Sequence, residues 1–189
     1  MKGDEEESHG RPTNCGTASP AMTSWGMRAP LASLVFLAFL AAQSDAADIV
    51  GAARAIDGDT LEIAGRQICL HGIDAPEVAQ RCQRAGKAWP CGRAASQTLA
   101  GLIGGKPVTC QTWDDVPSGR LVAQCSVDWL DLGAEMVNRG LAIALERQAL
   151  DYVQNHREAR ARGVGLFAGE FIEPSRWRRG QRHPIELID

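Results

Sequence analysis

The stretch QICLHGIDAPE, residues 67–77, joins a strand pattern to a cluster of acidic side chains. Asp74 and Glu77 lie three residues apart around Pro76, directly after the apolar run that predicts the strand. Carboxylates gathered at the end of a strand indicate a cation site or acid–base chemistry. A site that acts on an anionic substrate also needs a positive side chain on that strand, yet Cys69 stands five residues before Asp74. The stretch therefore raises the question whether the site is complete.

The elements around this stretch follow an order that is typical of a small β-barrel. Three short strands joined by tight turns precede a helix, and two more strands and two more helices follow it. Five strands with a helix between the third and the fourth predict a five-stranded OB-fold Greek-key barrel with three α-helices, a mainly β (α+β) fold. The expected strands are 49–55, 60–64, 67–73, 107–113 and 120–127, the expected helices are 92–103, 131–138 and 151–162, and 75–90 is expected to be a loop.

The cysteines after the N-terminal part predict two disulfides and one leftover thiol. A hairpin that joins residues 107–113 to 120–127 can place Cys110 directly opposite Cys125, close enough to bridge. Cys82 and Cys91 flank a loop that contains Gly and Pro, and they form the natural second pair. Cys69 then remains, and we expect it to be a buried, inert thiol. Other pairings stay open at this point, and the absence of any C-x-x-C motif argues against a zinc site.

The N-terminal part has the pattern of a targeting segment and is not expected to belong to the fold. Residues 31–42 form an apolar run that is too short to span a membrane, and small residues precede a cleavage position after residue 46. We therefore expect a signal peptide at 27–46 and an exported protein, periplasmic or extracellular. Residues 1–26 are interpreted as a mis-assigned or disordered extension, residues 47–179 as one domain and residues 180–189 as a C-terminal tail.

The charge balance does not favour a protein that binds nucleic acid by charge alone. The chain has 20 Lys and Arg against 23 Asp and Glu, a net charge of −3. Nonspecific binders that neutralise phosphates are usually more basic. Several arginines gather late in the chain, and we interpret them as part of a solvated C-terminal tail: Arg176, Arg178, Arg179 and Arg182.

A second acidic stretch, Asp57-Gly58-Asp59-Thr60, lies in the turn between the first two expected strands. Because the first three strands are contiguous, this turn and the stretch 74–77 can meet at one end of the barrel. Three carboxylates and a backbone carbonyl would form an all-oxygen nest that suits calcium. Either stretch alone is weak evidence, since D-G-D is also an ordinary turn and D-A-P-E an ordinary strand exit.

Taken together, six segments of the chain resemble the staphylococcal nuclease (thermonuclease) family. The resemblance covers residues 48–179, in the family's order and at suitable spacings. Its segments are IDGDTLEI, GIDAPE, GRLVAQC, MVNRGLA, GLFAGEF and RWR. It implies the same five-stranded barrel that the turn and periodicity patterns predict.

The resemblance also implies a role for individual residues. In that family, calcium is held by carboxylates that match Asp59 and Asp74 and by the backbone carbonyl at the position of Ala75. The matching residue for the carboxylate that orients or deprotonates the attacking water is Glu77. Arg120 matches the arginine that stabilises charge on the phosphate, because a planar guanidinium can pair with two oxygens at once.

The family places a second catalytic arginine on the third strand, where this chain has Cys69. Arg66 is no simple replacement, because an odd offset along a strand points to the opposite face. Gln67 and His71 share the face of Cys69, but Gln is neutral and His is only partly protonated near pH 7. Loss of one such donor costs about 10²–10³ in rate in comparable sites. The opening question is therefore answered by a site that is damaged in one part but not dismantled.

Two functions are compatible with these residues. The first is an exported, calcium-dependent nuclease that hydrolyses DNA or RNA with low sequence specificity, at a rate reduced by Cys69. It would take Ca²⁺ as cofactor and nucleic acid as substrate, and we expect a monomer without stable membrane association. The alternative is a catalytically impaired OB-fold binding module, with a polysaccharide or a protein as ligand. The near-neutral charge and the sparse aromatic residues favour the alternative.

Overall fold

Five strands close into a barrel in the computed structural model, which describes residues 48–115, 121–146 and 149–187. The strands run in the order β3-β2-β1-β7-β8, and a parallel pairing of β3 with β8 closes the ring. All other neighbours in the ring are antiparallel, so the barrel is mixed. The expected OB-type α+β fold is confirmed. The barrel strands are β1 (Ile49–Ala55), β2 (Thr60–Ile63), β3 (Arg66–Leu70), β7 (Pro107–Asp115) and β8 (Leu121–Val127).

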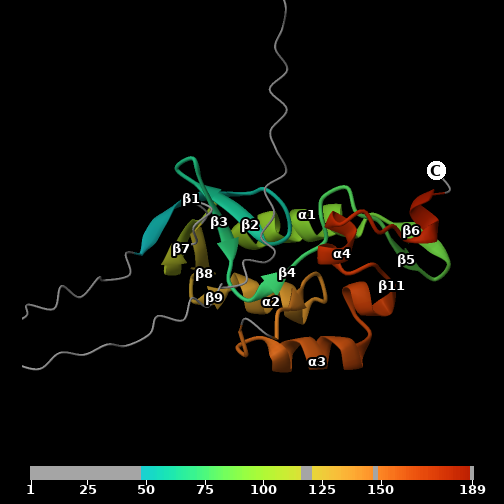
Figure 1. The fold of residues 1–189 in the computed structure, drawn as a ribbon. Helices are drawn as coiled ribbons and strands as arrows, with labels where there is room; N and C mark the ends of the chain where they lie inside the picture. Colours follow the sequence, from blue (N-terminus) through green and yellow to red (C-terminus); the bar gives the residue numbers. More distant parts are fainter. Residues whose placement is uncertain (1–47, 116–120, 147–148, 188–189) are drawn as a thin grey trace, which may run out of the picture.

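Side chains of alternating direction fill the barrel. Leu61 of β2 lies opposite Ile68 of β3, and both are fully buried. Two helices close the barrel from outside the ring of strands (Figure 1). Helix α1 (Cys91–Ile103) contributes Leu99, and α2 (Leu132–Asn138) contributes Met136, each without exposed surface. The expected helices 92–103 and 131–138 are thus present, and the Asp131 carboxylate caps α2 by accepting from the Ala134 N–H at 2.9 Å.

The remaining elements lie mainly on one side of the barrel (Figure 1). Helix α3 packs against α2 and starts two residues later than expected. A fourth, short helix near the C-terminus was not predicted. These elements are β4 (Ile73–Asp74), β5 (Cys82–Arg84), β6 (Lys87–Trp89), β9 (Leu130–Asp131), β10 (Ile143–Ala144), β11 (Gly169–Glu170), α3 (Val153–Arg162), α4 (Pro174–Arg178) and the 3₁₀ helices η1 (Gly165–Ala168) and η2 (Pro184–Leu187).

The hairpin of β7 and β8 has the expected register, with Cys110 opposite Cys125 and Thr112 opposite Ala123. The structure contains both expected disulfides, Cys110–Cys125 and Cys82–Cys91. The prediction for Cys69 was wrong: this residue is disulfide-bonded and not a leftover thiol.

Two other predictions need correction. The expected loop 75–90 contains the hairpin of β5 and β6, which pairs with β11 into a three-stranded sheet. The expected third strand, 67–73, is split into β3 and β4, because Gly72 adopts a left-handed backbone with φ of +71°. This break allows β4 to leave the barrel and pair with β10. The expected signal peptide and the extension at residues 1–26 lie outside the described residues. Within the described part, no helix has the length and apolar character that a bilayer crossing requires.

Candidate active site

The turn between β1 and β2 is built by its own acidic side chains. Asp57 accepts backbone N–H bonds from Asp59 at 2.9 Å and from Thr60 at 2.7 Å, which fixes the turn. Gly58 is required there, because a Cβ atom would come within 2.7 Å of the Cβ of Ala75. The turn thus points Asp59 toward the segment that follows β4, where its Oδ2 accepts from the Ala75 N–H at 2.6 Å. The two acidic stretches meet, as the contiguity of the first three strands predicts.

The second acidic stretch is positioned by β4 and by the start of α1. Asp74 lies opposite Ile143 of β10, and its side chain is only 3 % exposed. Glu77 follows Pro76 on the loop and keeps a fifth of its side chain exposed. Gly92 fixes the course of this loop, because a Cβ atom on Gly92 would overlap the carbonyl oxygen of Glu77. Asp74 is therefore buried, while Glu77 can reach a solvent molecule.

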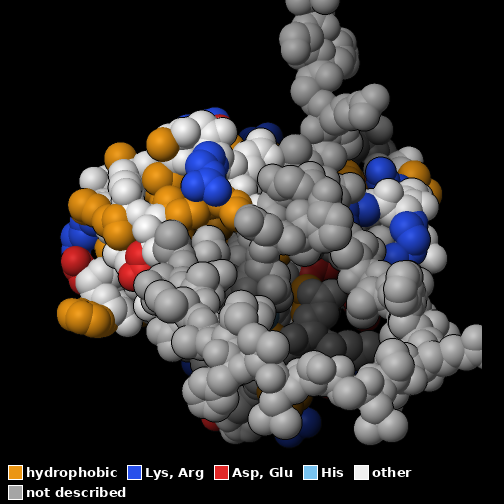
Figure 2. Space-filling view, turned by 60° about the vertical axis from the view of Figure 1, so that its left-hand side comes forward, with side chains coloured by type: hydrophobic (Ala, Val, Ile, Leu, Met, Phe, Trp, Pro, Cys, Tyr) orange, Lys and Arg blue, Asp and Glu red, His pale blue; other side chains and the backbone are white. Residues whose placement is uncertain are grey.

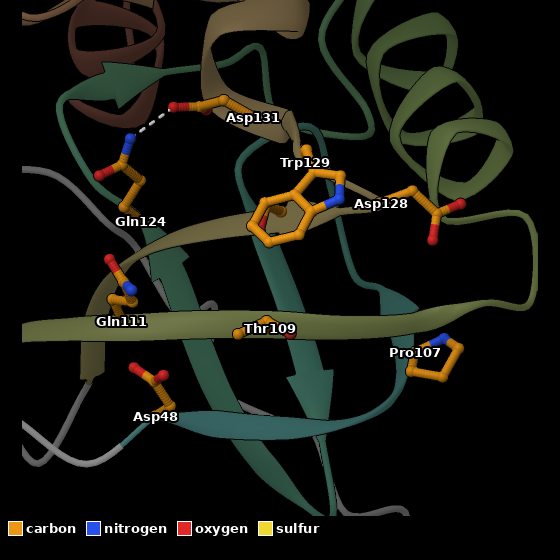
Figure 3. A pocket seen from close by; sticks show the side chains of 9 residues that line it. Asp48, Pro107, Thr109, Gln111, Gln124, Asp128, Trp129 and Asp131 are labelled. Atoms are coloured by element: carbon orange, nitrogen blue, oxygen red, sulfur yellow. Dashed lines mark hydrogen bonds between the residues drawn. The ribbon is translucent and has the colours of Figure 1, made fainter.

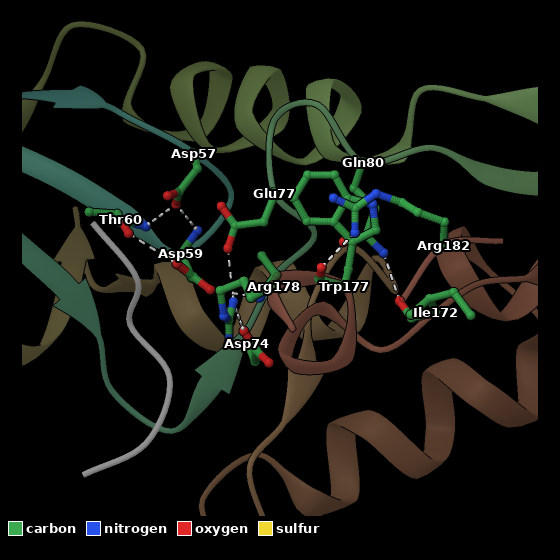
Figure 4. A network of polar contacts seen from close by, with 11 residues as sticks. Asp57, Asp59, Thr60, Asp74, Glu77, Gln80, Ile172, Trp177, Arg178 and Arg182 are labelled. Carbon is green, nitrogen blue, oxygen red and sulfur yellow. Dashed lines mark hydrogen bonds and ion pairs between the residues drawn. The ribbon is translucent and has the colours of Figure 1, made fainter. Parts of the chain in front are cut away.

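A guanidinium from the far end of the chain joins these carboxylates. Nη1 of Arg178 in α4 donates to Oδ1 of Asp74 and to Oε1 of Glu77, both at 2.9 Å (Figure 4). The Arg178 side chain is 10 % exposed, and its Nη2 is buried without a hydrogen-bond partner among the described residues. The interpretation of the late arginines as a solvated tail is wrong for Arg178. We call Asp57, Asp59, Asp74, Glu77 and Arg178 together the carboxylate site.

Helix α4 is held in place by polar contacts on both sides. The fully buried Gln80 donates from Nε2 to the carbonyl of Ile172 at 2.6 Å, which ties the loop after Glu77 to the segment before α4. Trp177 donates from Nε1 to Glu186 of η2 at 2.8 Å. Two sequence features could have revealed this helix: Pro174 at its first position and the apolar Trp177 beside Arg178.

Comparison with known proteins agrees with this fold. Residues 67–168 match the family model described as "Staphylococcal nuclease homologue". The chain belongs to this family. The match includes most of β3 together with Asp74 and Glu77, whereas Asp59 precedes it and α4 follows it. Among curated proteins, "Succinoglycan biosynthesis protein ExoI" of Rhizobium meliloti (strain 1021) is 31% identical over 126 residues. That alignment covers 65% of this chain and 66% of the relative, slightly less than two thirds of the relative's length.

In this staphylococcal nuclease homologue, burial shapes the charge of the site. Burial raises the pKa of Asp59 well above its ordinary value, and the nearby negative charge of Asp57 adds to the rise. Burial also raises the pKa of Asp74 and of Glu77, although the hydrogen bonds and charge of Arg178 partly oppose it. For Arg178 itself, burial lowers the pKa, but the two carboxylates more than offset this and raise it. Two of the four carboxylates, Asp74 and Glu77, thus share the guanidinium of Arg178.

Cys69 lies where the family resemblance places the second arginine. It pairs with Thr60 of β2, so both point to the outer face of the barrel, and Thr60 donates from its hydroxyl to Asp59 at 3.0 Å. Cys69 is 3 % exposed and disulfide-bonded. It therefore adjoins the carboxylate site but supplies no positive charge. Arg120, the other expected arginine, lies outside the described residues.

The chemistry of the site fits a calcium ion. Asp59, Asp74 and the Ala75 carbonyl offer only oxygen, which is the ligand type that calcium prefers. Burial disfavours the charged form of Asp59, so a bound cation would stabilise that charge. Across the described residues, however, no three His, Cys, Asp or Glu side chains are grouped to hold a metal ion. The expected set contains two carboxylates and one carbonyl, and Arg178 at present takes one oxygen of Asp74.

The part of the described surface that is visible in Figure 2 shows no continuous basic track. In the view of Figure 2, the Lys and Arg side chains that are visible lie scattered over the surface. On this face, a polyanion gains little from the surface charge, and its recognition there depends on individual cations.

Proposed function

We propose that this protein is an exported, calcium-dependent nuclease that hydrolyses phosphodiester bonds of DNA or RNA with low sequence specificity. One observation carries the proposal: Asp59, Asp74 and Glu77 come from two separate stretches and converge at one end of the barrel. Membership of the staphylococcal nuclease homologue family supports it. Two disulfides within the fold support export, because such bonds persist mainly in oxidising compartments.

In this proposal each carboxylate has its own task. Asp59, Asp74 and the Ala75 carbonyl would hold calcium, which would polarise a phosphoryl oxygen and offset developing negative charge. Glu77 is the more exposed carboxylate, and its free oxygen orients the attacking water or accepts its proton. Its raised pKa brings it closer to neutral pH, which favours proton transfer. Asp57 serves the turn, because Oδ1 already accepts two backbone N–H bonds.

Arg178 compensates for the cation that Cys69 does not supply. Its contact with Oε1 of Glu77 fixes the carboxylate that faces the water, so we assign Arg178 as a positioning residue. Its second nitrogen, Nη2, has no hydrogen-bond partner in the described part of the chain and is a further donor in the same place. With Arg120 as the guanidinium for the phosphate, the site then has two arginines although β3 provides none.

A second candidate is a binding module without catalysis. It is favoured by the pairing of Arg178 with both Asp74 and Glu77, because carboxylates that are already neutralised gain less from a metal ion. The relative named for succinoglycan biosynthesis is consistent with a role of this kind in polysaccharide metabolism.

The deciding experiment measures cleavage of single-stranded DNA by the full-length protein with calcium and with chelator. Cys69→Arg is tested beside Cys69→Ser, which removes the disulfide without adding a charge. The nuclease proposal expects calcium-dependent cleavage by the unmodified protein. Cleavage that appears only in Cys69→Arg would support the binding module, and no cleavage by any form would contradict the nuclease proposal.

A further inference from the structure

The turn between β8 and β9 contains a tryptophan in an unfavourable conformation. Val127 pairs with Leu130, so Asp128 and Trp129 form a two-residue hairpin turn. Both have a positive φ, 47° for Asp128 and 72° for Trp129. A turn of this type strongly prefers Asn-Gly or Asp-Gly, because only Gly takes a positive φ without steric cost. Trp129 occupies the glycine position of such a turn.

Nothing in the described part of the fold explains this choice. Trp129 is 100% exposed, so it buries no apolar surface. No hydrogen bond and no ring contact of its indole occurs among the described residues. A residue that breaks a local rule without a packing gain points to a role outside folding.

A groove lies beside Trp129 on the outer face of the barrel, with a volume of about 700 Å³. Its floor carries neutral polar side chains in two cross-strand pairs, Thr109 with Ser126 and Gln111 with Gln124. Figure 3 shows Trp129 on the turn beside this face, with the amides of Gln111 and Gln124 on the neighbouring strands. We call these five residues, with Asp48, Pro107, Asp128 and Asp131, the Trp129 groove.

The charge of the groove excludes a polyanion. Its lining contains Asp48, Asp128 and Asp131 but neither Lys nor Arg. Lys106 pairs with Asp128 at 2.6 Å but not with Asp48 or Asp131. A phosphodiester chain would meet repulsion here, whereas single-strand binders use aromatic platforms in a basic groove.

Neutral hydroxyl groups fit the same lining. The Gln111 and Gln124 amides and the Thr109 and Ser126 hydroxyls offer both donors and acceptors. An exposed indole offers a flat apolar surface, and apolar pockets with a few fixed polar groups are typical of small-ligand sites. A sugar has both matching features, since its ring has an apolar C–H face and its rim carries hydroxyls.

We infer that the Trp129 groove binds a neutral oligosaccharide, with one sugar ring stacked on the Trp129 indole. Asp131 shapes the groove, because its Oδ2 accepts from Gln124 Nε2 at 2.6 Å and from the Tyr152 hydroxyl at 2.9 Å. None of the lining residues belongs to the carboxylate site. The inference is therefore independent of nuclease activity.

The test measures binding of cellohexaose, laminarihexaose and maltohexaose to the full-length protein by calorimetry. We expect at least one of these neutral hexasaccharides to bind, and Trp129→Ala to weaken that binding by about tenfold or more, as for other aromatic stacking platforms. Leu150→Ala is the matched control, because Leu150 is 79% exposed but outside the groove. Absence of binding for all three sugars, or equal binding by Trp129→Ala, would overturn the inference. So would single-stranded DNA that binds through Trp129 in place of the sugars.

A second variant separates ligand binding from folding. Trp129→Gly should weaken the sugar as Trp129→Ala does, yet it should raise the melting temperature, because Gly relieves the positive φ. A lower melting temperature of Trp129→Gly would show that the indole supports the fold, and it would overturn the inference.

Discussion

In the carboxylate site, charged side chains are buried, hydrogen-bonded to one another and drawn from three distant parts of the chain. In the Trp129 groove, neutral polar side chains lie on the outer face of two strands, and the fully exposed Trp129 indole makes no hydrogen bond or ring contact with the described residues. The carboxylate site is recognised by charged side chains whose burial costs folding free energy. The Trp129 groove is recognised by a strained, exposed residue that the fold does not need. The two regions therefore need different tests. In the carboxylate site a charged side chain is replaced and the loss of rate or stability is measured, whereas in the Trp129 groove the strained residue is replaced and a gain of stability is expected.

The largest effect is expected from Glu77→Gln. This change keeps the size of the side chain but removes the proton acceptor, so calcium-dependent cleavage of single-stranded DNA should fall by about 10²–10³. Glu62→Gln is the matched control, because Glu62 makes an exposed pair with Arg54 at 3.2 Å on β2. Steady-state cleavage rates check the prediction, and equal rates for both variants would exclude Glu77 from the chemistry.

Arg178→Gln should have an effect of comparable size, on stability rather than on rate. It leaves Asp74 and Glu77 buried without their cation, and loss of one partner of a buried pair typically costs about 3–5 kcal/mol of unfolding free energy. Urea unfolding in the presence of chelator measures the loss. Added calcium should restore more stability to Arg178→Gln than to the wild type, because it can replace the missing positive charge.

The control for Arg178→Gln is Arg176→Gln in the same helix. Arg176 is 57% exposed, and its one ion pair among the described residues is with Glu173 at 3.6 Å, so its loss should change stability by less than about 1 kcal/mol. If the two variants unfold alike, the contact of Arg178 with the carboxylates contributes nothing that a surface pair does not.

A smaller effect is expected from removal of the Cys82–Cys91 disulfide, which holds the loop after Glu77 against the start of α1. The double change Cys82→Ala with Cys91→Ala should lower the unfolding free energy by about 2–3 kcal/mol, because it frees a short loop in the unfolded chain. Since this disulfide adjoins the carboxylate site and not the Trp129 groove, cleavage should suffer while hexasaccharide affinity stays. A parallel loss of both would show that the two regions depend on one common element.

The sequence predicted the barrel because its signals are local. The turn at Asp57-Gly58-Asp59 and the cross-strand register of Cys110 with Cys125 follow from residues that are close along the chain. The convergence of Asp59 with Asp74 followed from the contiguity of the first three strands. These parts needed no knowledge of distant contacts.

Arg178 could not be placed in the same way. It contacts Glu77 across 101 residues, and no periodic pattern connects the two. The Trp129 turn was missed for a different reason: its sequence, Asp-Trp, lacks the Gly that announces such a turn. Long-range pairing and broken local rules are the two features that sequence patterns do not carry, and both occur here at proposed functional sites.

The smallest effect is expected from Asp59→Asn. Burial raises the pKa of Asp59 above its ordinary value of 3.8, so the native state binds this proton more tightly than the unfolded state. In chelator, the stability of the wild type should therefore fall as the pH rises from 3.8 through the raised pKa. The Asn side chain carries no charge and can keep both contacts, with its oxygen toward the Ala75 N–H and its amide toward the Thr60 hydroxyl. At pH 7 in chelator, Asp59→Asn should be more stable than the wild type, and the difference should shrink as the pH falls toward 3.8.

Calcium should reverse this order, because binding to the native state alone stabilises a protein and Asn is the weaker ligand. Thermal unfolding at both pH values, with chelator and with calcium, checks all four arms, and Asp151→Asn serves as the control with an exposed carboxylate. An Asp59→Asn variant that is less stable than the wild type at pH 7 in chelator would mean that the hydrogen bonds of Asp59 outweigh its buried charge. The buried charge would then not be what distinguishes the carboxylate site from the Trp129 groove. Its residues would be held by local hydrogen bonds, and calcium would gain little by neutralising Asp59.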